Sequence, residues 1–140
     1  MKIILNTIPP TINKYIGRTN IWEYQKEKKL IHQAIRMQTI GINPRFNKCK
    51  MKITYYFKDK RKHDPSNYDK MLLDGLVEAN IIEDDNYDVI KEFTTIGKVD
   101  RGNPRVEIEI EEVNNEWWSI NNTNYLYNTN INSINREVLW

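Results

Sequence analysis

The spacing of apolar side chains predicts a helix over residues 68–79. Apolar positions recur there at intervals of three and four, which is typical of an amphipathic helix packed on a core. These positions are Tyr68, Met71, Leu72, Gly75, Leu76 and Ala79. We expect Ser66 or Asn67 to cap the N-terminus of this helix and Asn80 to end it in the left-handed conformation.

A second, less regular helical pattern runs from Ile21 to about Gln38 and contains two polar exceptions. Asn20 stands in position to cap this helix, and Gly41 stands in position to stop it. The segment before it, residues 11–20, is rich in loop-forming residues. We therefore expect a loop followed by a helix of about five turns.

Four stretches have the composition or the alternation of β-strands. They are residues 2–6, 50–57, about 88–97 and 106–111. In the last of these, Val106, Ile108 and Ile110 alternate with three glutamates, which predicts a strand with one acidic, solvent-facing side. The tight turn at residues 100–104 suggests that the last two strands form an antiparallel hairpin.

These elements predict an α+β fold in the order β-α-β-α-β-β, with two helices on one face of a small mixed sheet. The 140 residues of the chain have room for one domain. We place this domain at residues 1–113 and treat residues 114–140 as a tail of unassigned role. Nine of the last 27 residues are Asn, and three of the four tryptophans lie there. A disordered tail, a partner-binding strand and a flap around a second subunit all stay open for this segment.

The cysteine content and the lack of long apolar runs limit the cellular compartments in which we expect the protein. Cys49 is the only cysteine, so an intrachain disulfide and a cysteine-based zinc site are both excluded. This usage fits a reducing cytoplasm, where we expect the protein to reside. No apolar run approaches the roughly 20 residues of a membrane helix. The first residues lack the apolar stretch of a secretory signal, so we expect neither a membrane segment nor a targeting segment.

Charge is distributed unevenly along the chain. Residues 1–63 hold 15 Lys or Arg and 3 Asp or Glu, whereas residues 64–140 hold 6 and 16. This asymmetry indicates either a polyanionic partner for the basic half or neutralisation of one half by the other. Charge alone favours neither interpretation. The cations that we assign to DNA binding are Lys14, Arg18, Lys58, Lys60, Arg61 and Lys62.

Acidic residues flank the helix predicted at 68–79. Asp64 precedes it, and Asp85 follows it in the run Glu83-Asp84-Asp85. If the fold brings Asp64 and Asp85 together, their oxygens suit Mg²⁺, which commonly binds one or two protein carboxylates together with water and phosphate oxygens. Lys70, one turn into the helix, can then add positive charge beside a phosphate. The alternative is that these are ordinary turn and loop residues, and spacing alone favours it.

The two histidines offer little chemistry. Neither His32 nor His63 has a His or Cys neighbour at metal-ligand spacing, and with five glycines the chain shows no Gly-rich phosphate loop. His63 adjoins Asp64 and can touch a phosphate or tune that carboxylate. We nevertheless expect it to be a surface residue.

Five ordered segments resemble the RusA family of Holliday-junction resolvases, many of which are encoded by phages and prophages. These segments are residues 8–14, 62–70, 73–76, 82–85 and 103–108. Together the similarity spans about residues 1–113. The resemblance implies a small homodimeric, Mg²⁺-dependent endonuclease that binds four-way DNA junctions and makes paired nicks.

The resemblance also implies a set of site residues. The family motif Asp-x-Asp-Asn-x-x-Lys and a later Asp correspond to Asp64, Asn67, Lys70 and Asp85, with Ser66 in place of the second Asp of the motif. We therefore assign Asp64 and Asp85 as metal ligands and Lys70 as a catalytic residue. Asp84 is a further possible ligand. Losing one carboxylate at Ser66 predicts weaker Mg²⁺ binding, unless Asp69, Asp84 or a water held by Ser66 compensates.

The sequence is also compatible with two other functions. One is a protein that binds junctions or other structured DNA with weak or no nuclease activity. The other is a metal-dependent nuclease that acts on flaps or other branched nucleic acid. A dimer fits the resolvase reading, because two sites related by a two-fold axis match a two-fold symmetric junction.

Overall fold

The computed structural model describes residues 1–11 and 21–114, and it contains the predicted elements in the predicted order. They are β1 (Lys2–Leu5), α1 (Ile21–Gln38), β2 (Cys49–Phe57), α2 (Ser66–Glu78), β3 (Ile90–Val99) and β4 (Arg105–Glu112). Lys14 and Arg18, the cap expected at Asn20 and the tail from residue 115 lie outside the described residues. Neither of the two described helices has the length and apolar character needed to cross a membrane.

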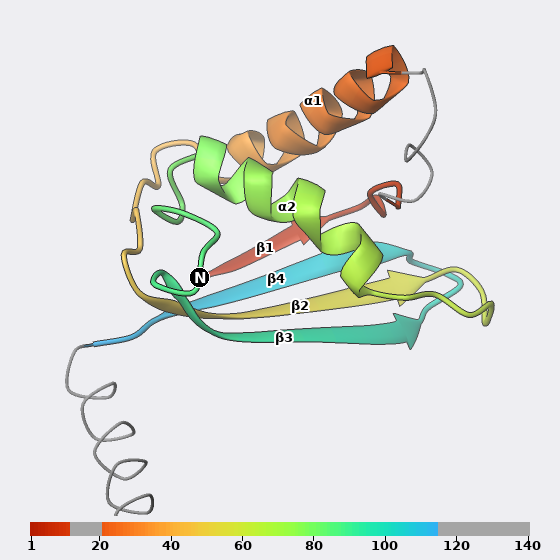
Figure 1. Cartoon of the computed structure of the whole chain (residues 1–140). Coiled ribbons are helices and arrows are strands. Elements are labelled where there is room, and N and C mark those ends of the chain that lie inside the picture. Colours follow the sequence, from red (N-terminus) through yellow and green to blue (C-terminus); the bar gives the residue numbers. More distant parts are fainter. Residues whose placement is uncertain (12–20, 115–140) are drawn as a thin grey trace, which may run out of the picture.

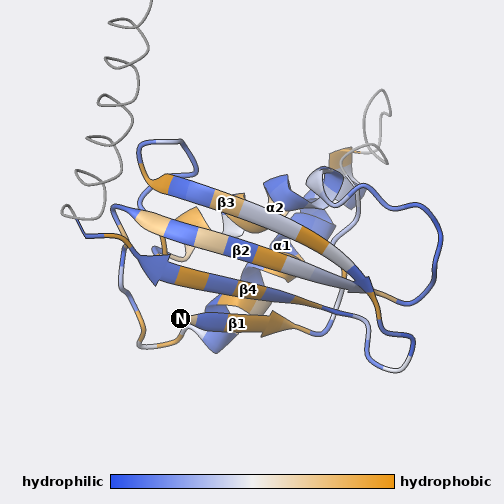
Figure 2. Cartoon of the chain, turned by 90° about the horizontal axis from the view of Figure 1, so that it is seen from below, coloured by the Kyte–Doolittle hydropathy of each residue, from blue (hydrophilic) through white to orange (hydrophobic). Residues whose placement is uncertain are grey.

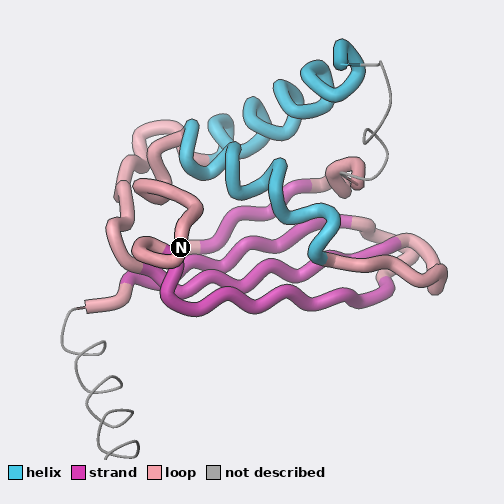
Figure 3. Tube along the Cα trace, in the orientation of Figure 1, coloured by secondary structure: helices cyan, strands magenta, loops and turns pink. Residues whose placement is uncertain are grey.

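The fold is α+β, and both helices lie on the same face of the sheet, as predicted (Figure 1). No described helix covers the opposite face, and hydrophilic positions alternate with hydrophobic ones along the strands (Figure 2). Figure 3 shows the two helices stacked above the four strands, with the loops gathered at the two ends of the sheet. The core fills the space between these layers and includes the fully buried Ile35, Ile53, Leu72 and Leu76.

The sheet is mixed, with the strand order β1-β4-β2-β3. β2 pairs parallel with β3, and β4 lies antiparallel between β1 and β2. The predicted antiparallel hairpin of the last two strands is therefore wrong. The turn reverses the chain but passes across the end of β2, where the Asp100 N–H donates to the Phe57 carbonyl at 2.8 Å.

Burial explains why β4 lies inside the sheet and β3 at its edge. Val106 and Ile108 on β4 are fully buried, and Ile110 is 2% exposed, so this strand gains most from neighbours on both sides. β3 instead carries exposed polar side chains such as Glu92, Thr94 and Lys98, which an edge position leaves in solvent.

Close packing of the helices depends on Gly75. A Cβ atom at this position would lie 2.7 Å from the Ile35 Cδ1 atom and 2.9 Å from the His32 Cδ2 atom, both on α1. The absence of a side chain therefore lets α2 approach α1, and this contact fixes α2 over the sheet.

The ends of α2 confirm one expected cap and correct the other. Asn80 adopts a positive φ of 55°, as predicted for the residue that ends the helix. At the other end Pro65 occupies the N-cap position, and no side chain among the described residues caps the helix. Ser66 and Asn67 lie within the first turn, so the prediction that either caps α2 is wrong. The hydroxyl of Ser66 bonds the Asp64 carboxylate instead.

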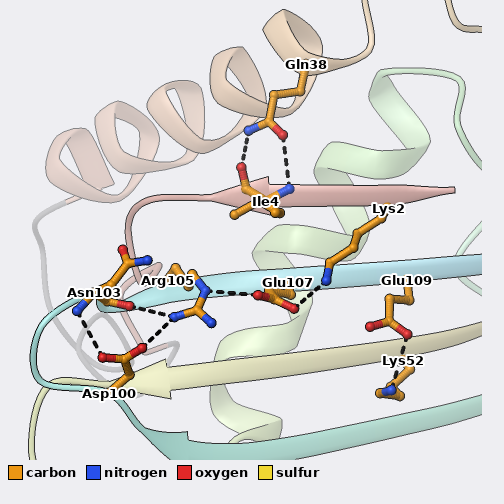
Figure 4. A network of polar contacts seen from close by, with 9 residues as sticks. All are labelled: Lys2, Ile4, Gln38, Lys52, Asp100, Asn103, Arg105, Glu107 and Glu109. Carbon is orange, nitrogen blue, oxygen red and sulfur yellow. Dashed lines mark hydrogen bonds and ion pairs between the residues drawn. The ribbon is translucent and has the colours of Figure 1, made fainter.

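The two halves of the chain partly neutralise each other on the open face of the sheet. Lys2 on β1 lies 2.7 Å from Glu107 on β4, and Lys52 on β2 lies 3.2 Å from Glu109 (Figure 4). Both lysines belong to the basic half and both glutamates to the acidic half. Part of the charge asymmetry is thus used inside the fold.

Candidate active site

Lys70 and Asp85 meet beside α2. The Lys70 Nζ atom lies 2.9 Å from Asp85 Oδ2 and 2.9 Å from Asp74 Oδ1, one helical turn further along α2. Asp85 reaches this position because the chain turns back after Asn80 and runs along the helix. Two of the residues that we predicted for catalysis are therefore in direct contact, although they are 15 positions apart in the sequence.

The ion pairs shift the pKa values of both partners toward their charged forms. The hydrogen bonds that Lys70 donates to Asp85 first and to Asp74 second raise the pKa of Lys70, and the bond that Asp85 accepts from Lys70 lowers the pKa of Asp85. The Lys70 side chain is still 54% exposed. It is a permanently charged cation that solvent or a phosphate can reach.

Asp64 lies just before α2 and is held by its neighbour. One oxygen, Asp64 Oδ1, accepts hydrogen bonds from the Ser66 backbone N–H at 3.1 Å and from the Ser66 hydroxyl at 2.6 Å. The backbone N–H of Asn67 donates to the Asp64 carbonyl. The carboxylate is exposed. Ser66 therefore orients the carboxylate at the motif's first position.

The structure contains no preformed cage for a metal ion. Within residues 1–11 and 21–114, no group of three or more His, Cys, Asp or Glu is placed to hold one. The chemistry of the donors still fits Mg²⁺, which needs few protein ligands and keeps several waters. The hydrogen bonds from Ser66 and Lys70 use Asp64 Oδ1 and Asp85 Oδ2, so Asp64 Oδ2 and Asp85 Oδ1 lie outside these contacts. Each carboxylate thus has one oxygen to offer.

Asp84 stabilises the loop that carries Asp85. Its carboxylate accepts hydrogen bonds from the Asp85 backbone N–H at 2.8 Å and from the Asn86 side-chain amide at 2.6 Å. Both of its oxygens are therefore engaged within the loop. Asp84 remains a possible ligand only if one of these bonds is given up.

Asp69 lies in the core under the site. It is 7% exposed, and it accepts hydrogen bonds from the Tyr55 hydroxyl at 2.6 Å and the Thr95 hydroxyl at 3.2 Å. Burial raises its pKa, and the nearby charge of Asp64 adds to the shift. This carboxylate ties α2 to β2 and β3. It is a poor substitute for the missing ligand at Ser66, because it points into the core.

Sequence reasoning missed this contact, although one signal was available. Asp69 has the same helical spacing from Leu72 and Leu76 as the apolar positions have from one another. A carboxylate on the buried face of a helix requires a hydrogen-bond donor from another element.

His63 is not the surface residue that we expected. Its ring stacks on Phe57, with ring centroids 4.0 Å apart. Its Nε2 atom lies 3.0 Å from Asp59 Oδ1, and its Nδ1 atom lies 3.2 Å from the Tyr68 hydroxyl. The side chain is 20% exposed. His63 thus anchors the loop between β2 and α2, and no sequence signal pointed to this stack.

The basic loop, residues 58–62, projects from the end of β2 next to Asp64. Its three lysines, Lys58, Lys60 and Lys62, are exposed and form no ion pair within the described part of the chain. Arg61 is also exposed, but its guanidinium pairs with Asp59 at 2.8 Å. Three of the four predicted contacts are therefore available to a polyanion without breaking an ion pair.

Comparison with known families gives one match. The model of the family described as endodeoxyribonuclease RusA matches residues 9–111. This range includes α1, the basic loop, α2, the loop that carries Asp85 and nearly all of β4. No curated protein matches the chain.

Proposed function

The chain belongs to the RusA family of Holliday-junction-resolving endodeoxyribonucleases, and on this basis we propose that it resolves four-way DNA junctions by paired, Mg²⁺-dependent nicks. The reaction is assigned to Asp64, Lys70 and Asp85, and the chain acts as a homodimer. Resolution of junctions serves recombination and repair. The observation that carries this assignment is the contact between Lys70 and Asp85, because it joins the motif lysine to the late aspartate.

Lys70 contributes positive charge at the scissile phosphate. Its ammonium group is exposed and its pKa is raised by its carboxylate partners, so it is charged at neutral pH. A phosphate oxygen can replace a carboxylate as its partner at little electrostatic cost. Because negative charge builds up on the phosphate during the reaction, such a cation is worth more in the transition state than in the ground state.

Asp64 and Asp85 would hold the metal ion through the oxygens that they have available. A bound Mg²⁺ supplies an activated water and offsets charge on the phosphate. Ser66 orients Asp64 by its two hydrogen bonds, so the carboxylate is presented in a fixed direction. Asp74, the second partner of Lys70, positions the ammonium group along α2.

The basic loop binds the phosphates that surround the cleavage point. It is adjacent to Asp64 in the chain, and its three unpaired lysines can each replace a counterion on DNA. Such contacts read no sequence, so affinity comes from the backbone and the shape of the junction. The sequence in which the junction is cut is left to other contacts.

A comparison of substrates tests the proposal. Labelled four-way, flap and linear DNA of equal length are incubated with the protein in Mg²⁺, and in EDTA as a control. We expect symmetric nicks in the four-way junction, little cleavage of linear DNA and none in EDTA. Preferential cleavage of flaps would favour a different branched-DNA nuclease. Tight junction binding without cleavage at any Mg²⁺ concentration would favour a binding protein.

A further inference from the structure

The two edges of the sheet differ in whether their outward-facing backbone groups are hydrogen-bonded. β1 has four residues, and the side-chain amide of Gln38 bonds both the N–H and the carbonyl of Ile4 (Figure 4). This amide occupies the outward-facing backbone groups in the middle of the strand. The β1 edge is thereby closed to a further strand, which is a common way of blunting a sheet edge.

The β3 edge has no such cap in the part of the chain that the structure describes. β3 is ten residues long and pairs only with β2. Two large apolar side chains stand exposed along it, Phe93 at 41% and Val99 at 45%. A long edge strand with free backbone groups is a template for pairing with another chain.

One hydrogen bond identifies which residues of β3 direct their backbone groups outward. The Asp100 N–H donates to Phe57 on β2, and backbone N–H groups alternate in direction along a strand. Even-numbered residues near this end therefore face β2. The N–H and carbonyl groups of Phe93, Thr95 and Gly97 consequently face the open edge.

We propose that a second copy of this chain pairs antiparallel with β3, so that Thr95 lies opposite Thr95 of the second copy. This inference rests on the proposed function for its biological meaning and names the surface that makes the dimer. In this register Glu92, which also lies 3.5 Å from Lys50 of its own chain, is opposite Lys98 of the second copy, and the two-fold axis repeats the pair. Phe93 lies opposite Gly97 of the second copy, where apolar atoms of Pro65 and Phe57 approach the position of a Cβ atom to 3.4 and 3.5 Å.

Neighbouring registers fit less well. Only shifts of two residues keep the outward-facing groups in hydrogen-bonding pairs. A shift in one direction places Glu92 opposite Ile96, and a shift in the other places it opposite Asp100, a like charge. The register centred on Thr95 is therefore the one that pairs opposite charges directly across the strands.

This pairing brings the two active sites to one face. Antiparallel pairing of edge strands gives a continuous eight-stranded sheet with a two-fold axis perpendicular to it, so the helices of both copies lie on the same side. The Thr95 hydroxyl donates to Asp69 on α2, next to Lys70 in the chain. The N-terminal halves of both α2 helices therefore flank the axis. Two sites that face one junction from the same side suit paired nicks.

Charge reversal at the two positions tests the pairing. Glu92→Lys and Lys98→Glu each turn both attractive cross-strand pairs into repulsive ones, so each variant should dimerise at least about tenfold more weakly in sedimentation equilibrium without DNA. An equimolar mixture of the two variants should regain dimers, because every cross-strand pair is then attractive. The matched control is Glu109→Lys, which breaks an ion pair with Lys52 on the same face but away from β3, and it should dimerise like the parent.

Disulfide cross-linking gives a second readout. Thr95→Cys should form a covalent dimer on mild oxidation, because residues opposite each other on the axis have Cα atoms about 5.5 Å apart. Thr94→Cys, its neighbour, meets Ile96 of the second copy rather than itself and should cross-link poorly. The native Cys49 is buried in both variants.

The outcomes separate this inference from the proposed function. A monomeric parent, dimers indifferent to both reversals, or a mixture that does not recover would each overturn the pairing, even if the protein cleaves junctions. Dimers that follow the charge pattern support the pairing, even if no junction is cleaved.

Discussion

Replacing Lys70 by alanine should separate catalysis from stability. The side chain is 54% exposed, and its partners Asp74 and Asp85 are 24% and 27% exposed. Ion pairs in such surroundings contribute about 0–1 kcal/mol each, because solvent screens them. Lys70 forms two such pairs, so we expect Lys70→Ala to lower the free energy of unfolding by no more than about 2 kcal/mol, which is less than about 10 °C in Tm.

The effect on cleavage should be much larger. Removing one donor aimed at developing negative charge typically costs about 10²–10³-fold in rate, or about 2.7–4 kcal/mol. Junction affinity should fall only slightly, by the share of one phosphate contact. The assay is single-turnover cleavage of a four-way junction in Mg²⁺, with affinity measured separately in EDTA and unfolding followed by circular dichroism.

Lys28→Ala is the matched control, since Lys28 on α1 also pairs with Asp74, at 3.5 Å. This variant loses a similar ion pair without removing the motif lysine, so it should cleave at close to the parent rate. Equal losses of rate and affinity in Lys70→Ala would make Lys70 an ordinary phosphate contact. A Lys28→Ala variant as slow as Lys70→Ala would assign the effect to Asp74 and its ion pairs instead.

Three further predictions concern the surroundings of the site. Tyr55→Phe removes a hydrogen bond to the buried Asp69 and should cost about 1–3 kcal/mol of stability. The fold already raises the pKa of Asp69, and the substitution should raise it further, so urea titrations should show a larger loss of stability at pH 8 than at pH 4.5. Equal losses at the two pH values would contradict a role for the ionised Asp69 carboxylate. Alanine at all three lysines of the basic loop should flatten the salt dependence of junction binding by up to about 0.9 per lost contact, whereas an unchanged slope would remove the loop from the interface. Ser66→Asp places a second carboxylate beside Asp64. It should therefore lower the Mg²⁺ concentration for half-maximal cleavage and make Tm depend more steeply on Mg²⁺. Loss of activity at every Mg²⁺ concentration, in a protein that is still folded, would show that position 66 is not a vacated ligand site.

The order of the elements and their bounds to within about two residues could be predicted from local pattern. α1 has the predicted bounds because its spacing and its breaker at Gly41 are local properties. The partners of β3 and β4 could not be predicted, since the turn at residues 100–104 specifies a reversal of direction and not adjacency. β4 lies inside the sheet because Val106 and Ile108 are buried there between β1 and β2, which are distant in the sequence.

The candidate site was predictable only in part. The motif gave Asp64, Lys70 and Asp85 as residues, but the contact between Lys70 and Asp85 depends on how the loop after Asn80 folds back along α2. Ser66 was expected as a helix cap or an empty ligand position, whereas its hydroxyl holds Asp64. Such contacts depend on side-chain directions at a helix terminus, which residue spacing does not encode.

The most direct test of the account compares Asp85→Asn with the parent on one four-way junction. Asparagine keeps the shape of the side chain and removes the charge that would hold Mg²⁺ and that pairs with Lys70. We expect single-turnover cleavage in Mg²⁺ to fall below detection. Junction affinity in EDTA should equal that of the parent or be tighter, since a negative charge has left the DNA-facing site. Cleavage at the parent rate would contradict the claim that Asp85 and its contact with Lys70 form the active site.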